Sequence, residues 1–295
     1  MNHEKNSKPR IFCIGGTGLV GSRIIELLKD SYEIINLSRE TGVDIRNPQT
    51  LEQLKNDTSD AFVILLAAKT DVDSCENDKT LGKEGETWKI NVEGTQNIIN
   101  ACKNGNKKLI YISTDFVFGG NDPVSGGFTE EDIPSPVNWY GVTKYEGEKL
   151  VANSGLPYIF ARIAYPYRET FPQKKDFVRA IREKLQSGLS VSAITDHIMT
   201  PTFIDDIAHA LDKLIANSQS GIYHVVGSQF VSPYEAAGLI AHAFGLNSSL
   251  ISKTTKEEFF KNKAPRPFNL SLKNDKIQRL GVKMKSFEEG LFSLK

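Results

Sequence analysis

The chain has few of the residues that mark metal-binding or disulfide-bonded proteins. Its three cysteines, Cys13, Cys75 and Cys102, are odd in number and too far apart for a CxxC metal motif. The five histidines lie in separate segments without the paired spacing of a zinc site. We therefore expect reduced cysteines and find no motif for a bound metal.

Long apolar runs and an excess of either charge are also missing. Nowhere do eighteen apolar residues follow one another, and the first ten residues contain no apolar stretch of a secretion signal. The 36 basic side chains balance the 36 acidic ones, so no net field attracts a nucleic acid or an anionic membrane. These absences predict a cytoplasmic protein that binds neither partner.

What the chain does contain is a regular alternation of short apolar runs and amphipathic stretches. At 295 residues, 39% of them hydrophobic, it can bury a large core. After an opening strand at residue 11, runs typical of buried strands occupy 33–38, 61–68, 108–114 and 158–164. Helical stretches lie between them at 22–30, 86–104 and 142–155. This order predicts an α/β fold with a doubly wound parallel sheet of the Rossmann type.

Beyond residue 164 the alternation becomes irregular. Further helices are expected at 176–187, 204–217 and 233–245. We interpret residues 1–164 mainly as an NADP-binding domain and residues 165–295 mainly as a smaller α/β substrate-binding lobe. Some segments of this lobe, such as the run IYHVV, are expected to return to the main sheet.

Three glycines spaced by three residues, Gly15, Gly18 and Gly21, connect the opening strand to the first helix. In a GxxGxxG sequence at this place the first glycine makes a tight turn, the second lets a pyrophosphate approach, and the third permits close helix packing. The N-terminus of the following helix attracts the phosphates. The pattern predicts a dinucleotide site, although glycines also occur in ordinary tight loops.

The residues after the second strand bear on the choice of cofactor. An acidic residue there would bind the ribose hydroxyls of NAD(H), but the chain has Ser38 and Arg39. A guanidinium suits the 2′-phosphate of NADP(H) as a bidentate partner. We therefore expect NADPH, with NAD left open and a solvated surface charge as the alternative role of Arg39.

Tyr140 and Lys144 lie four residues apart at a predicted helix start and project from one face. A free tyrosine titrates near pH ~10, and a neighbouring ammonium favours the phenolate and lowers that pKa. Such a tyrosine can exchange a proton with a substrate oxygen. The strand at 108–114 delivers Ser113 and Thr114 to the sheet edge where open α/β sheets bind ligands. These side chains predict an oxidoreductase site, with capping and packing as the structural alternative.

The order GxxGxxG, STD and YxxxK resembles the extended short-chain dehydrogenase/reductase family. The stretches AAKTDVDSCE, STDFVFGG, PSPVNWYGVTKYEGE, TPTFIDDIA and RPFNLSLKNDKIQRLG are most similar to its dTDP-4-dehydrorhamnose reductases. The resemblance implies NADPH-dependent reduction of a keto group on a nucleotide-activated deoxysugar.

The resemblance also implies which residues form the site. As catalytic residues it implies Thr114, Tyr140 and Lys144. As cofactor contacts it implies Gly15, Thr17, Gly18, Leu19, Val20, Gly21, Ser38, Arg39, Asp44, Ile45, Ala67, Ala68, Lys69, Tyr140 and Lys144. As substrate contacts we expect Val72, Ser113, Asp115 and Arg266.

Positions at which this sequence differs from other members of the family reduce the number of candidate functions. Dehydratases of this family place an Asp–Glu pair after the catalytic threonine, whereas here Phe116 follows Asp115. Epimerases usually have an acidic residue of the NAD type, which we do not identify in this chain. The reductases usually carry an Asn–Phe pair where this chain has Asp176 and Phe177, so we expect a different sugar pocket. Ser113 lacks the flanking glycines of a hydrolase nucleophile.

Several alternatives stay open. The family includes a non-catalytic partner of methionine adenosyltransferase, so a cofactor-binding regulatory subunit is the second hypothesis. A nucleotide-sugar epimerase is the third. A homodimer, and a divalent ion at a subunit contact, are compatible with the resemblance but have no motif of their own.

Overall fold

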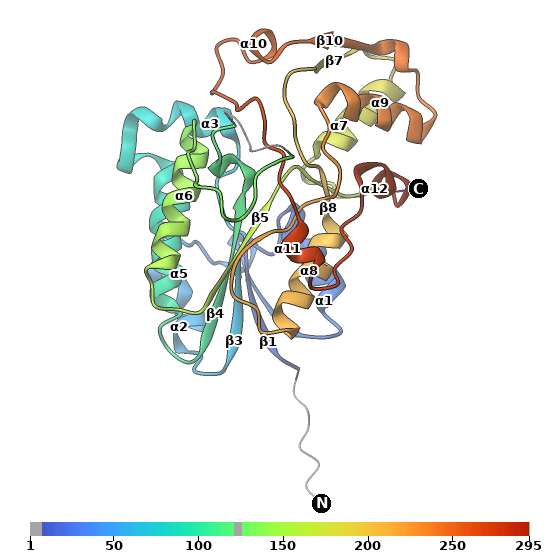
Figure 1. Cartoon of the computed structure of the whole chain (residues 1–295). Helices are drawn as coiled ribbons and strands as arrows, with labels where there is room; N and C mark the ends of the chain where they lie inside the picture. The colour runs from blue at the N-terminus through green and yellow to red at the C-terminus, as the bar shows by residue number, and fades with distance from the viewer. Residues whose placement is uncertain (1–7, 121–125, 295) are drawn as a thin grey trace, which may run out of the picture.

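The computed structural model describes residues 8–120 and 126–294. At its centre is a six-stranded sheet whose neighbouring strands are all parallel (Figure 1). In spatial order the strands are β2 (Glu33–Leu37), β1 (Arg10–Ile14), β3 (Ala61–Leu65), β4 (Lys107–Thr114), β5 (Tyr158–Ile163) and β9 (Gly221–His224). The predicted doubly wound parallel sheet is confirmed. The strand order reverses between β1 and β3, the place where such sheets bind ligands.

The register brings the carboxyl ends of the strands to a common edge. Ile14, the last residue of β1, lies opposite both Leu37 of β2 and Leu65 of β3. Thr114, the last residue of β4, lies opposite Ile163 of β5. The segments that follow these strands are therefore neighbours in space, although they are far apart in the sequence.

Helices cover both faces of the sheet (Figure 1). On one face lie α1 (Leu19–Leu28), α8 (Ile204–Ala216) and α11 (Asp275–Gln278). On the other lie α2 (Glu52–Asn56), α5 (Gly94–Ala101) and α6 (Trp139–Ala152). Within β1, Ile11 packs toward the first group, whereas Phe12 and Ile14 pack toward the second. This period of two is what a strand buried on both faces requires.

The segment between β3 and β4 contains an irregular turn where one helix was predicted at 86–104. It consists of α3 (Val72–Asn77), η3 (Lys79–Glu84), α4 (Glu86–Trp88), the π-helical turn η4 (Lys89–Glu93) and α5. Such π-turns are frequent at functional sites. Here the turn directs Asn91 toward Lys69, whose backbone N–H donates to the Asn91 side chain at 2.8 Å.

The rest of the chain forms a smaller layer at the carboxyl edge and also returns to the sheet. Two short parallel pairs join β7 (Val191–Ile194) to β10 (Ile251–Thr254) and β6 (Pro166–Tyr167) to β8 (Thr202–Phe203). The helices of this layer are α7 (Phe177–Gln186), α9 (Pro233–Phe244), α10 (Lys256–Phe259) and α12 (Phe287–Phe292). The expected return is seen in β9, which extends the main sheet beside β5. A division of the chain at residue 164 remains a prediction.

The remaining short helices lie in connections. They are the 3-10 turns η1 (Arg39–Thr41), η2 (Pro48–Leu51), η5 (Asp115–Val117) and η6 (Ser248–Leu250). Within residues 8–120 and 126–294, no helix has the length and apolar character that a bilayer crossing requires.

Candidate functional site

The glycine-rich loop between β1 and α1 has a backbone that other residues would not fit. Gly15 has φ +84°, and a Cβ at this position would lie 2.8 Å from the backbone nitrogen of Ala67. A Cβ at Gly21 would lie 2.7 Å from the carbonyl oxygen of Gly15. Gly18 begins α1 without a side-chain cap, so the first N–H groups of the helix face the loop. This combination suits a pyrophosphate.

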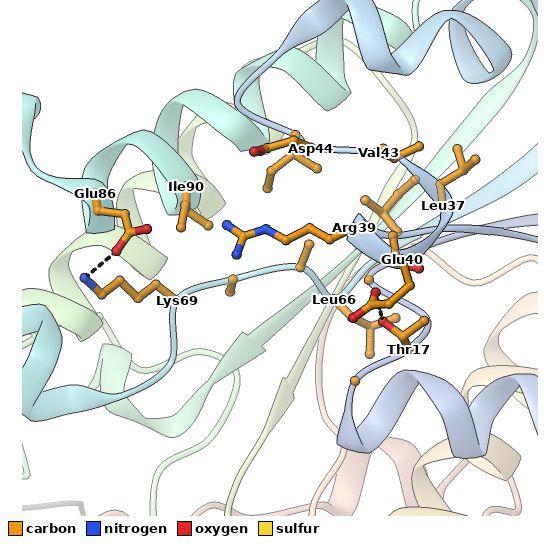
Figure 2. Close-up of a pocket in the computed structure, with 17 residues that line it drawn as sticks. Thr17, Leu37, Arg39, Glu40, Val43, Asp44, Leu66, Lys69, Glu86 and Ile90 are labelled. Atoms are coloured by element: carbon orange, nitrogen blue, oxygen red, sulfur yellow. Dashed lines mark hydrogen bonds and ion pairs between the residues drawn. The ribbon is translucent and has the colours of Figure 1, made fainter. Parts of the chain in front are cut away.

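A cavity of about 390 Å³ opens beside this loop (Figure 2). It lies where the carboxyl ends of β1, β2 and β3 meet. The expected cofactor residues among its walls are Gly15, Thr17, Gly18, Ser38, Arg39, Asp44, Ile45, Ala67, Ala68 and Lys69. The structure thus gathers these ten positions around one space, while their contact with a cofactor stays a prediction.

The charged side chains of this cavity differ in whether they have partners. Asp44 receives hydrogen bonds from Arg46, which hold its pKa down at about 2. Lys69 donates to Glu86 at 3.0 Å. Arg39 extends into the cavity in Figure 2, and within the described part of the chain its guanidinium has no hydrogen bond or ion pair. Arg39 is therefore free to meet an anion.

Glu40 is a residue of this cavity that the sequence reasoning missed. It follows Arg39 directly and accepts a hydrogen bond from the Thr17 hydroxyl at 2.6 Å (Figure 2). This bond lowers the pKa of Glu40 and keeps its carboxylate ionised. The expectation that no acidic residue follows the second strand was therefore incomplete. The sequence signal that could have indicated Glu40 as a site residue was its position two residues after Ser38, just beyond the second strand.

A second cavity, of about 480 Å³, adjoins the first and shares Gly15, Gly18, Leu66 and Ala68 with it. It brings together most of the predicted reaction residues. Those among its walls are Leu19, Val20, Gly21, Val72, Ser113, Thr114, Asp115, Tyr140 and Lys144. The two cavities therefore adjoin at the carboxyl edge of the sheet.

Tyr140 and Lys144 are placed by the first turns of α6. Asn138 caps this helix, and its side-chain oxygen accepts a hydrogen bond from the Gly141 N–H at 2.9 Å. Lys144 is 3% exposed, and its ammonium donates to the carbonyl of Ile112 at 2.8 Å and lies 4.0 Å from the centre of the Tyr111 ring. Burial lowers the pKa of Lys144 to about 7, an effect that Glu148 opposes.

The pKa of Tyr140 departs from its expected direction. Burial raises it well above its ordinary value, and only the neighbouring Thr114 hydroxyl acts to lower it. Lys144 is not among the groups that act on the Tyr140 pKa in this structure, and its ammonium donates to the Ile112 carbonyl, so the predicted lowering of the Tyr140 pKa by Lys144 remains a prediction. The phenol keeps its proton at neutral pH, as an ordinary tyrosine does, and the raised pKa makes it a weaker acid than a free tyrosine.

The end of β4 supplies three polar side chains in sequence. The Thr114 hydroxyl donates to Asp115 Oδ1 at 2.8 Å and accepts from the Phe116 N–H at 3.2 Å. Burial raises the pKa of Asp115 to about 7. The hydroxyl of Ser113 is buried and has no hydrogen-bond partner within residues 8–120 and 126–294. These groups face the same cavity as Tyr140.

Arg266 is the predicted substrate residue that lies apart from the others. Its guanidinium donates to Asp73 in α3 and to the carbonyl of Ala264, and it lies over the ring of Phe260. Arg266 is not among the described residues that line either cavity. Its role as a substrate contact remains a prediction.

Tyr165 and the segment after it complete the second cavity and were not predicted as site residues. Tyr165 has φ +40°, which is unusual for a residue with a side chain. Its hydroxyl lies 2.9 Å from His197 Nε2. Asp176, whose departure from the family was noted, caps α7 through the Arg179 N–H, and its neighbours Lys174 and Lys175 line the cavity. The sequence signal that could have indicated Tyr165 as a site residue was its position just beyond β5, at the carboxyl end of the strand.

No group of three or more His, Cys, Asp or Glu side chains is arranged to hold a metal ion within the portion of the chain that the structure covers.

Comparisons with known proteins agree with this architecture. The chain is 29% identical to methionine adenosyltransferase 2 subunit beta of Rattus norvegicus, over 92% of this chain and 83% of that protein. It is 28% identical to dTDP-4-dehydrorhamnose reductase of Aggregatibacter actinomycetemcomitans, over 97% and 98% of the two chains. The solved dTDP-4-dehydrorhamnose reductase of Bacillus anthracis, a complex with NADP, superposes with a TM-score of 0.86 at 29% identity and covers 97% of this chain and 98% of its own.

A family model described as the RmlD substrate binding domain matches residues 9–294. Because this match takes in both the sheet and the smaller layer, the chain belongs to the RmlD substrate-binding family of extended short-chain dehydrogenase/reductase proteins.

Proposed function

We propose that this protein is an NADPH-dependent reductase of the keto group of a nucleotide-activated deoxysugar, of the dTDP-4-dehydrorhamnose reductase type. The observation that carries the proposal is the shared cavity of Thr114, Tyr140, Lys144 and the glycine-rich loop. A proton donor therefore lies beside the loop expected to hold the cofactor phosphates.

The residues present fit NADP(H). The loop at Gly15 and Gly21 leaves a cradle that a Cβ would fill, and the N-terminus of α1 faces it. Arg39 is placed to bind a 2′-phosphate, and Asn91 fixes the loop at Lys69 that would lie along the cofactor. When bound, NADPH supplies the hydride.

The protein's own groups handle the substrate oxygen. Tyr140 is protonated at neutral pH, and it donates this proton to the oxygen as the alcohol forms. Thr114 and Ser113 lie at the same edge and hydrogen-bond that oxygen. In its ammonium form Lys144 has three N–H donors and uses one for Ile112, which leaves two for the ribose of the cofactor.

A second candidate is a cofactor-binding regulatory subunit. It is favoured by the 29% identity to methionine adenosyltransferase 2 subunit beta over 92% of the chain. The intact set of Thr114, Tyr140 and Lys144 favours the reductase instead. Co-elution with a purified methionine adenosyltransferase, together with a change in its kinetics, would support the regulatory candidate. An epimerase, the third candidate, would convert its sugar without net consumption of NADPH.

The test is the decay of NADPH absorbance with a panel of dTDP-, GDP- and UDP-linked 4-keto-6-deoxysugars. We expect decay with one of these sugars, and its loss in Tyr140→Phe. The matched control is Tyr145→Phe on the same helix. Tyr145 packs in a neighbouring apolar cluster and is not among the described residues that line either cavity, so this variant should keep its activity. No decay with any sugar, or full activity of Tyr140→Phe, would contradict the proposal.

A further inference from the structure

Asp115, which we expect to contact the substrate, takes no part in the proton and hydride transfers described so far. Its side chain is 2% exposed and belongs to the wall of the second cavity. Oδ1 accepts the hydrogen bond of the Thr114 hydroxyl at 2.8 Å. Oδ2 is buried and has no hydrogen-bond partner among the residues that the structure describes. A buried carboxylate oxygen without a donor is costly, so its protonation state needs an explanation.

The hydrogen bonds of Thr114 limit what its hydroxyl can do. A hydroxyl has one proton to donate and two lone pairs that accept. The proton is given to Asp115, and one lone pair accepts the Phe116 N–H at 3.2 Å. While Asp115 is ionised, the hydroxyl can therefore present only a lone pair to a substrate oxygen, and two acceptors repel.

Protonation of Asp115 reverses this arrangement. A neutral carboxyl donates its own proton to the Thr114 oxygen, whose second lone pair accepts it. The Thr114 proton is then free to point into the cavity. The Phe116 N–H keeps its bond throughout, so only two protons change direction.

The surroundings of Asp115 favour its neutral form. The titratable groups that face it are Tyr140 of α6 and Tyr165 after β5, and both are buried phenols rather than cations. Lys144 directs its ammonium to Ile112, Cys75 of α3 acts electrostatically on Tyr140, and His197 lies within hydrogen-bonding distance of the Tyr165 hydroxyl. No lysine or arginine of the described ranges forms an ion pair with Asp115. Burial raises its pKa to about 7, against the opposing hydrogen bonds of the Thr114 hydroxyl and of the backbone N–H groups of Asp115 and Phe116.

We propose that Asp115 is a positioning residue that works as a neutral carboxylic acid: it donates to the Thr114 oxygen and thereby directs the Thr114 proton to the keto oxygen of the substrate. This inference rests on the proposed reductase function. It adds a requirement for the protonated state of Asp115, and it predicts that reduction weakens as the pH rises through the pKa of this carboxyl.

The first experiment measures the ionisation of Asp115 without any turnover. Carboxyl carbon NMR of protein labelled at aspartate is recorded against pH, and the Asp115→Asn variant identifies the signal. We expect Asp115 to titrate near pH 7. A titration near the ordinary value of about 4 would overturn the inference and leave the reductase proposal intact.

The second experiment measures kcat and KM against pH. Wild-type kcat is expected to fall by up to about tenfold per pH unit above about pH 7. Lys144, whose pKa burial also lowers to about 7, contributes its own fall in both proteins. Asp115→Asn cannot ionise, and its amide N–H can donate to Thr114, so its fall of kcat should be shallower than that of the wild type. In a Thr114→Val background the same substitution should leave the profile unchanged. An unaltered profile in Asp115→Asn, or an effect that persists without Thr114, would overturn the inference.

A matched control comes from a second Thr–Asp pair. Asp132 accepts a hydrogen bond from the Thr129 hydroxyl at 2.9 Å and is not among the described residues that line either cavity. Asp132→Asn should leave the pH profile of kcat as in the wild type. Wild-type inactivity on every sugar would count against the reductase itself, whereas activity with an unmoved profile counts only against the role of Asp115.

Discussion

Arg39 differs from the other charged side chains of the first cavity, because Glu40, Asp44 and Lys69 each have a partner and Arg39 has none within the described residues. A hydrogen bond to a charged group is worth ~1.5–3 kcal/mol. Arg39→Ala is therefore expected to weaken NADPH binding by roughly 10- to 100-fold and to leave NADH binding nearly unchanged. Fluorescence titration with both cofactors measures this. Equal losses would show that Arg39 contacts a part that the cofactors share.

Lys144 should leave a signature in the stability of the protein. Burial lowers its folded-state pKa from 10.5 to about 7, so folding releases a proton between these values. The cost of the buried ammonium is full below about pH 7 and disappears as the pH rises toward 10.5. The unfolding free energy of the wild type should therefore rise with pH in this window relative to Lys144→Met. Denaturant unfolding of both proteins across the window tests this, and parallel curves would contradict it.

At the scale of the element, the start of α6 links stability to activity. Asn138 accepts from the Gly141 N–H and donates to the carbonyl of Pro265 at 3.0 Å. Asn138→Ala should cost ~1–2 kcal/mol and also lower kcat, since Tyr140 lies in the first turn. The control is Ser286→Ala, which removes the N-terminal cap of α12. No described residue of α12 lines either cavity. This variant should lower the stability similarly with kcat retained, and a comparable loss of kcat there would argue against a local effect.

The elements show what local sequence can predict. The strands at 33–38 and 61–68 lie within a few residues of β2 and β3, since apolar runs buried on both faces have few other solutions. The helix expected from 142 begins at Trp139 instead, because the Asn138 cap was not recognised. The π-turn around Asn91 could not be predicted, because its bonds to Lys69 form only when distant segments meet.

At the scale of the whole molecule, the site depends on contacts between distant parts of the chain. Arg23 of α1 donates twice to Asp205 of α8, 182 positions away, at 2.7 Å each. Arg168 donates to the Ser22 hydroxyl across 146 positions. Motif order predicts which residues gather at the sheet edge, because the register of parallel strands places them there. It does not predict Glu40 bound to Thr17 or Tyr165 bound to His197, since such pairs depend on side-chain directions.

The ion pair between Asp73 of α3 and Arg266 of the segment before α11 joins two such distant parts. If Arg266 is the anion contact that the motif predicts, Asp73 competes with the substrate for the guanidinium. Asp73→Asn should then lower the KM for the nucleotide sugar several-fold, whereas Arg266→Ala should raise it by about tenfold or more. Both variants break the same pair, so loss of a purely structural link would move both KM values in the same direction. Steady-state kinetics of the two variants, with melting temperatures to confirm folding, tests this. Opposite changes in KM indicate a substrate contact, whereas changes in the same direction indicate a purely structural ion pair.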